Sequence, residues 1–163
     1  MTVDELDAFG MRQMDDDDIE QTLAKQSVGV LGIPTDGAPM LRPLSYWFDG
    51  EDALYFVYVL AGESEKQGLT DAASAAQFLV YNVETPFNWR SVLLTGAVEA
   101  VDTAEREAIE ERMDVSWRPE LFERAVESET TAIYRFDIAE SDGIKQLELP
   151  PELREPSSEG RME

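Results

Sequence analysis

Residues 28–66 constrain the fold most strongly, because three apolar runs follow one another with a turn signal between each pair. In the first turn, residues 34–37, proline presets φ and the Asp36–Gly37 pair tolerates positive φ. The second turn is the polar segment 49–52. Apolar runs joined by short turns are typical of antiparallel strands. The sequence therefore predicts consecutive strands whose ranges are 27–33, 40–48 and 53–60.

Two of these strands carry information about their surroundings. Pro43 lies inside the second strand, where it has no N–H to donate to a ladder. It therefore predicts an edge, a bulge, or backbone that faces something other than a neighbouring strand. The third strand has apolar residues on both faces, with residues 55–59 in direct succession. This pattern predicts burial on both sides, in a barrel wall covered outside by a helix or a partner subunit.

The remaining chain supplies further strands. Apolar runs predict strands at 77–83, 89–101 and 130–138, with a loop at 84–88. Residues 143–149 either continue the last strand or pair with it after a turn. Gly96, within the 89–101 run, indicates a bulge or a barrel corner. About six strands in an antiparallel meander, closed into a small barrel, would leave no exposed edge.

Helices are expected between and before these strands, while residues 1–14 show only a weak pattern. Acids at the start of 15–26 complement a helix dipole, and similar signals indicate helices at 65–75, 104–113 and 119–126. The length suits one domain, expected over 1–149. Residues 150–163, rich in Pro, Ser and Glu, are expected to form a disordered acidic tail.

The charge balance limits the partners. With 35 acidic and 13 basic residues the net charge is −22, which repels nucleic acid and anionic membranes. The acids are spread along the whole chain and lysine is scarce, a composition that we interpret as halophilic rather than as a surface for a basic protein. No apolar run reaches the ~18–20 residues of a membrane span, and the N-terminus lacks a secretory pattern. We therefore expect a cytoplasmic location.

The chain has no cysteine and no histidine. This excludes disulfides, thiol catalysis, Cys/His zinc sites and Ser-His-Asp triads. The segment 15–18 does not follow the spacing of a calcium loop, so no metal site is predicted. Chemistry must depend on carboxylates, Tyr, Lys, Arg or a bound cofactor, and no catalytic residue can be singled out.

A few residues are candidates for binding an anion. Ser64 resembles a helix N-cap and Lys66 follows it, so the free N–H groups, the helix dipole and the lysine together could hold a phosphate. The alternative is a capping serine beside a surface lysine. Arg42 is either an exposed residue or an inward anchor for an anion. Trp89 and Ser91 are expected on one face of their strand, with Val92 on the other.

The order of these elements resembles that of a known family. It is a strand, the Asp-Gly turn, the RPLSY strand, the YF strand, the GxSxK helix start and the W-x-S-V-x-x-x-G strand. They are similar to the flavin-binding split barrels of the pyridoxamine 5′-phosphate oxidase-like superfamily, especially its small pyridoxamine 5′-phosphate oxidase-related members. The resemblance covers roughly residues 19–138. It implies a mainly β fold, a six-stranded antiparallel split β-barrel with peripheral helices, which forms a homodimer and binds FMN in two clefts at the dimer interface.

The resemblance also assigns roles to residues. It implies that Arg42 contacts the phosphate and that Ser64 and Lys66 also bind it. The backbone of Pro43, Leu44 and Ser45 would lie along the flavin ring, and the end of the next strand would contribute Tyr58 and Val59. Ser91 would approach the flavin from the other subunit. Glu65 departs from the family, which often has a basic residue there.

The leading hypothesis is an FMN-binding flavoprotein that acts as a flavin-dependent oxidoreductase on an unidentified small molecule. No substrate-phosphate motif is visible near the C-terminus, so pyridoxamine phosphate is not assigned as substrate. The alternatives are a non-catalytic module that stores or senses flavin, deazaflavin or haem, and a structural dimer with a vestigial cleft. Haem binding is weakened by the missing histidine.

Overall fold

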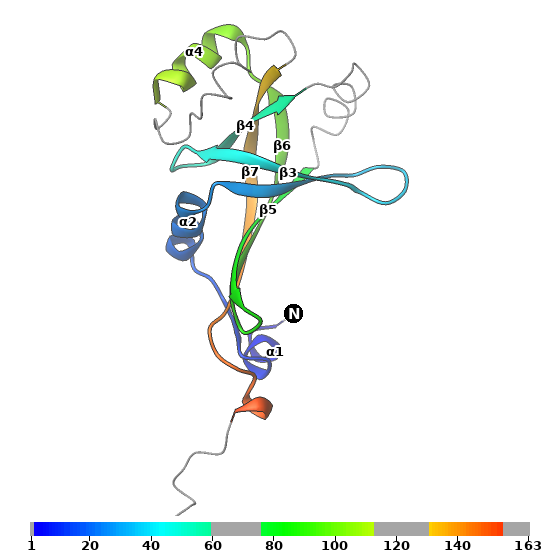
Figure 1. Cartoon of the computed structure of the whole chain (residues 1–163), viewed down its shortest axis with the longest axis vertical. Helices are drawn as coiled ribbons and strands as arrows, with labels where there is room; N and C mark the ends of the chain where they lie inside the picture. Colours follow the sequence, from blue (N-terminus) through cyan, green and yellow to red (C-terminus); the bar gives the residue numbers. More distant parts are fainter. Residues whose placement is uncertain (1, 60–75, 113–130, 155–163) are drawn as a thin grey trace, which may run out of the picture.

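The computed structural model describes residues 2–59, 76–112 and 131–154 (Figure 1). The strands are β1 (Met11–Gln13), β2 (Val28–Ile33), β3 (Met40–Phe48), β4 (Ala53–Val59), β5 (Ala76–Thr85), β6 (Asn88–Ala100) and β7 (Thr131–Gln146). The helices are α1 (Val3–Ala8), α2 (Asp16–Lys25), α4 (Thr103–Arg112) and the 3-10 turn η2 (Pro151–Leu153). The expected helices at 65–75 and 119–126 and most of the expected tail lie outside the described residues.

The strands form one antiparallel sheet that closes on itself. Its order is β1-β7-β4-β3-β2-β5-β6, and an additional β7–β6 pairing joins the last strand back to β7. Six strands, β2 to β7, therefore make a closed barrel with β1 as an extra strand, which confirms the predicted fold class. In Figure 1 the long strands β6 and β7 run along the molecule and β2, β3 and β4 cross them.

The expected single meander is wrong in one respect. The barrel consists of two meanders, β2-β3-β4 and β5-β6-β7, and β5 pairs with β2 rather than with the preceding β4. Pairing through β2–β5 and β4–β7 joins the two meanders into one barrel, which consecutive pairing alone would not do. Such long-range pairing carries no local signal in the sequence.

The N-terminal residues are more ordered than expected. Thr2 and Glu5 form a capping box at the start of α1, and β1 then pairs with the end of β7. The strand β7 is continuous through residues 140–143, so the alternative of one continued strand holds. The loop between β5 and β6 is shorter than predicted, because Thr85 and Asn88 are already paired.

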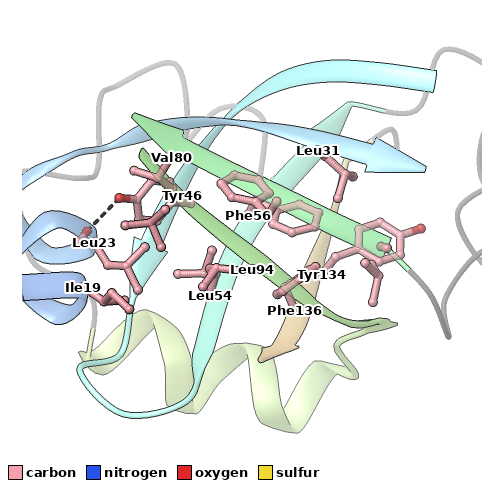
Figure 2. Packing of buried hydrophobic residues seen from close by; sticks show 14 of the residues in the cluster. Ile19, Leu23, Leu31, Tyr46, Leu54, Phe56, Val80, Leu94, Tyr134 and Phe136 are labelled. Atoms are coloured by element: carbon pink, nitrogen blue, oxygen red, sulfur yellow. Dashed lines mark hydrogen bonds between the residues drawn. The ribbon is translucent and has the colours of Figure 1, made fainter. Parts of the chain in front are cut away.

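Helix α2 packs against one end of the barrel. Its buried residues Ile19 and Leu23 join the main core cluster (Figure 2). The hydroxyl of Tyr46 on β3 donates a hydrogen bond to the carbonyl oxygen of Leu23, at 2.7 Å. Burial raises the pKa of Tyr46 far above its ordinary value. The largest fully buried side chains of the core include Phe56, Phe78 and Phe136, and the Phe78 ring lies edge-on to Tyr46.

The side chains of β4 that the structure describes, residues 53–56, are buried on both faces, as the sequence predicted. Leu54 and Phe56 belong to the main core, whereas Ala53 and Tyr55 pack in a second cluster with Ile109 of α4. The outer cover of this wall is therefore a helix. Within the described residues, no helix combines the length and apolarity required to cross a bilayer.

Gly96 lies at the irregularity that its sequence position predicted. The register between β6 and β7 shifts between Thr95 and Gly96. A Cβ atom at Gly96 would lie 1.9 Å from the backbone oxygen of Asp137, far inside contact distance. This close approach of β6 to β7 therefore requires glycine. The extra residue of the bulge is Ala139 of β7, between the partners of Thr95 and Gly96.

Candidate functional site

The barrel is split where β3 and β4 part. The β3–β4 ladder holds the pairs Tyr46–Phe56, Trp47–Tyr55 and Phe48–Leu54 and extends no further among the described residues. Beyond these pairs β4 remains with β7 as far as Val59, while β3 remains with β2 as far as Met40. Two stretches, 40–45 on β3 and 57–59 on β4, are therefore not paired with each other, and we call the place where they part the opening.

The backbone of β3 presents polar groups towards this opening. The amide of Tyr46 donates to the carbonyl oxygen of Ser27 on the β2 side, at 2.9 Å. Because amides alternate between the two sides of a strand, those of Leu41 and Ser45 point away from β2, and the nitrogen of Pro43 does the same. We call this side of residues 41–45 the β3 edge. A proline there removes no ladder hydrogen bond, which explains why the strand tolerates it.

Arg42 lies on the inward face of β3. Its register partner is Leu31, whose partner on β5 is Phe78, and both of these side chains are fully buried. Arg42 itself is half-buried. The side chain thus lies on the inward face, and its role as an anchor for an anion stays a prediction. A guanidinium half removed from water and next to the opening can make charge-assisted hydrogen bonds to an anion.

The structure brings together some of the predicted cofactor residues and leaves others outside its description. Pro43 and Ser45 are exposed on the face opposite Arg42, and Leu44 is half-buried on the same face as Arg42. Tyr58 and Val59 lie across the opening, paired with Ala132 and Thr131 of β7. Two predicted phosphate residues, Ser64 and Lys66, lie outside the described residues.

Ser91 lies on the opposite side of the sheet wall from Arg42. It pairs with Tyr81 of β5 and Ile144 of β7, and it is half-buried on the outer face of β6. Its neighbour Val92 is buried inside, as alternation predicted. Trp89, on the same outer face, donates its indole N–H to Gln146 at 2.9 Å. Ser91 therefore does not approach the opening of its own chain through the barrel interior.

An apolar surface surrounds Ser91. We call it the outer face: the side of β3, β2, β5 and β6 that carries the row Pro43–Val30–Leu79–Leu93. Leu93 is exposed, and further exposed large apolar side chains on the same face are Val28, Leu41, Tyr81 and Val83. Contiguous exposed apolar surface of this kind is typical of an interaction site.

Sequence reasoning missed one polar cluster, at the end of the sheet near α2. Arg12, Lys145 and Arg90 occupy directly opposed positions on β1, β7 and β6. Their spacing in the sequence gives no hint of this proximity. The one sequence feature that could have pointed to this cluster was the scarcity of lysine. It singled out Lys145 as much as Lys66.

Comparisons with known proteins identify the family and the fold. The model of a family described as "Pyridoxamine 5'-phosphate oxidase" matches residues 15–145. No curated protein matches the chain. Among solved structures, an FAD-binding protein from Mesorhizobium loti is 19% identical, with 85% of this chain and 98% of that chain covered and a TM-score of 0.66.

Two further solved structures share the fold. The FAD binding protein from Mycobacterium smegmatis is 14% identical, with 83% of this chain and 99% of that chain covered and a TM-score of 0.63. A flavocytochrome from Azotobacter vinelandii is 24% identical, with 91% and 73% covered and a TM-score of 0.63. Identities this low establish the fold alone. Because the family model matches most of the sequence, the chain belongs to the pyridoxamine 5′-phosphate oxidase family.

Proposed function

We propose that this protein binds a flavin, FMN, along the β3 edge and uses it as an oxidoreductase. The observation that carries the proposal is the early end of the β3–β4 ladder at Tyr46 and Phe56, which leaves the polar backbone of 41–45 facing an opening. A flavin ring has a hydrogen-bonding edge that can take the place of the missing strand. Relatives with the same fold are described as FAD-binding, which supports a flavin but not the choice of FMN.

The phosphate of the cofactor is assigned to Arg42, Ser64 and Lys66. The described part of this cradle is Arg42, half-buried on the inward face beside the opening. The sequence supplies the other two at an expected helix start, where free N–H groups and the dipole favour an anion. Glu65 opposes the phosphate electrostatically, so Arg42 carries a larger share of the affinity than in relatives with a basic residue there.

We further propose that the outer face is the interface of a homodimer. A dimer would bury exposed apolar residues such as Leu93 and Tyr81, and it would bring Ser91 towards the flavin of the partner. This accounts for a serine that lies on the opposite face from Arg42. Arg42 and Ser91 would then contribute to one site from two subunits.

The division of labour follows from the residues available. When bound, the flavin supplies the electron-transfer chemistry, which side chains of this sequence cannot perform. The chain contributes binding at the β3 edge, charge at Arg42 and, through the dimer, exclusion of water. With no histidine or cysteine in the sequence, proton transfer near neutral pH has to use the substrate, water or a carboxylate.

Absorption spectroscopy of the purified protein tests the proposal. We expect a flavin spectrum, and mass spectrometry of the released ligand should identify FMN rather than FAD or a deazaflavin. The double variant Arg42→Ala/Lys66→Ala should lose the cofactor, whereas Lys25→Gln, at an exposed position in the last turn of α2, should retain it. Stoichiometric yellow cofactor in the double variant would refute the assigned cradle.

Anaerobic addition of NADH or NADPH separates an oxidoreductase from a flavin store. Bleaching of the flavin band followed by reoxidation with an added acceptor supports turnover. If NADH and NADPH do not reduce the bound flavin, and flavin reduced with dithionite passes no electrons to an added acceptor, the result favours storage or sensing. Sedimentation in high salt tests the interface, because Leu93→Glu should convert a dimer into monomers and weaken flavin binding with it.

A further inference from the structure

The β-sheet aligns three cations in one row. Arg12 on β1 pairs in register with Lys145 on β7, and Lys145 pairs with Arg90 on β6. Directly opposed residues share a face, with Cβ atoms about 4.5–5.5 Å apart. We call Arg12, Lys145 and Arg90 the cation row. Like charges in such positions repel and destabilise the sheet, so this arrangement has a cost.

The same sheet treats another arginine in the opposite way. Arg135 on β7 makes ion pairs with Glu99, Glu105 and Asp137, so three carboxylates surround one guanidinium. In a chain with 35 acids and 13 bases, this is the expected environment of a cation. The cation row departs from it although acids are abundant throughout the sequence.

The row is only partly neutralised. Lys145 bonds to Asp18 of α2 at 2.8 Å, and the side chain of Lys145 is 22% exposed. Glu148, close by, pairs with Arg154. In the part of the chain that the structure describes, neither Arg12 nor Arg90 makes a salt bridge. Together with Lys145, Arg90 also lowers the pKa of Asp18. One carboxylate therefore faces two of the three cations, and these four groups carry a net positive charge on a protein whose total is −22.

A small hollow opens beside the row. It is lined by Gly10, Arg12, Lys145, Leu147 and Glu148. At Gly10 the chain passes close to the backbone of residue 148. The φ of Gly10 is +78°, and a Cβ atom there would lie 2.9 Å from the carbonyl oxygen of Glu148, so the position favours glycine. The hollow thus combines two cations, one carboxylate already engaged by Arg154, and one apolar side chain.

We propose that the cation row binds the phosphate group of a small molecule. Arg12 and Arg90 flank Lys145, and each guanidinium can present paired N–H donors to phosphate oxygens. Bound phosphate supplies the negative charge that the row lacks and relieves the repulsion among its members. Leu147 offers an apolar contact for an organic portion of the ligand.

This site is separate from the cofactor cradle. Arg42 shares its register row with Leu31, Phe78 and Leu94, and Arg90 lies four residues before Leu94 on β6. Four residues of strand span about 13 Å, in addition to the width of the barrel. A single phosphate cannot contact both arginines of one chain.

Calorimetric titration with two probes, inorganic phosphate and adenosine monophosphate, tests the proposal. The full-length protein, with whatever cofactor it carries, should bind at least one of them saturably. Arg12→Gln/Arg90→Gln should weaken binding by at least about tenfold, because two charge-assisted contacts are lost. Lys25→Gln, an exposed cation outside both proposed sites, should leave it unchanged.

The outcomes separate the alternatives. Tighter binding of adenosine monophosphate indicates an organic phosphate, and equal binding indicates phosphate itself; both support the site. Absence of saturable binding, or an undiminished affinity in the double variant, overturns it. Removing like charges should not lower the melting temperature of the ligand-free protein. If the double variant nevertheless unfolds, Arg12→Gln and Arg90→Gln alone carry the test.

Discussion

The Tyr46 hydroxyl joins helix α2 to the strand that borders the opening. Tyr46 is buried, and its hydroxyl group donates a hydrogen bond to the carbonyl oxygen of Leu23 at 2.7 Å. Among the β3 residues paired with β4, it is the one next to the opening. Leu23 lies in the last turn of α2, where carbonyl oxygens lack intrahelical partners. Tyr46→Phe would remove the donor and leave that carbonyl buried without its hydrogen bond.

The expected cost follows from the lost contact. A buried unsatisfied group costs about 1–3 kcal/mol, and no compensating cavity forms because the ring remains. For a domain of this size each kcal/mol corresponds to roughly 2–4 °C in melting temperature. Urea unfolding followed by circular dichroism at fixed high salt would measure the change in free energy of unfolding. Under conditions where the variant is folded, its flavin content should stay close to that of wild type, because Tyr46 does not belong to the cofactor cradle.

Tyr81→Phe is the matched control. It removes the same hydroxyl from an exposed tyrosine on β5, for which no hydrogen bond occurs within the described residues. Its effect should remain within about 0.5 kcal/mol. Equal losses in the two variants, or a loss below that value for Tyr46→Phe, would show that the contact with α2 contributes little.

Three further predictions concern stability. Gly96→Ala should strongly destabilise the barrel because its Cβ would lie 1.9 Å from the Asp137 oxygen, whereas Gly37→Ala meets nothing within 4 Å; equal melting temperatures would contradict the bulge. Melting temperature should rise between about 0.1 and 2 M KCl as self-repulsion is screened, and a flat profile would refute the halophilic interpretation. The Lys145 hydrogen bond lowers the pKa of Asp18 below its ordinary 3.8. The stabilisation that ionised Asp18 contributes is therefore present above pH 3.8 and is lost as pH falls through the lower pKa of the folded state. In urea unfolding, Asp18→Asn should be less stable than wild type near neutral pH, and the difference in free energy of unfolding should vanish in acid. A difference that does not change with pH would contradict this.

Much of the barrel was predictable because its signals are local. Strands β2, β3 and β4 follow from apolar runs and turn residues, and the burial of β4 on both faces follows from its unbroken apolar sequence. Gly96 was identified as a bulge from its place within a strand. Each inference required only neighbouring residues.

The remainder depends on contacts between distant parts of the chain. The β2–β5 pairing and the joining of Arg12, Arg90 and Lys145 arise from closure of the sheet, which no local pattern encodes. The parting of β3 from β4 was indicated by Pro43 alone. The strand β1 is three residues long, too short for a periodic signal, although the capping box of α1 was present in the sequence.

Hydrogen exchange of the flavin-stripped protein, compared with the protein after FMN is restored, tests the central claim most directly. If flavin lies along the β3 edge, peptides covering 40–45 and 57–59 should gain protection, including the amide of Ser45. Protection elsewhere in the barrel with none in these two stretches would contradict the account.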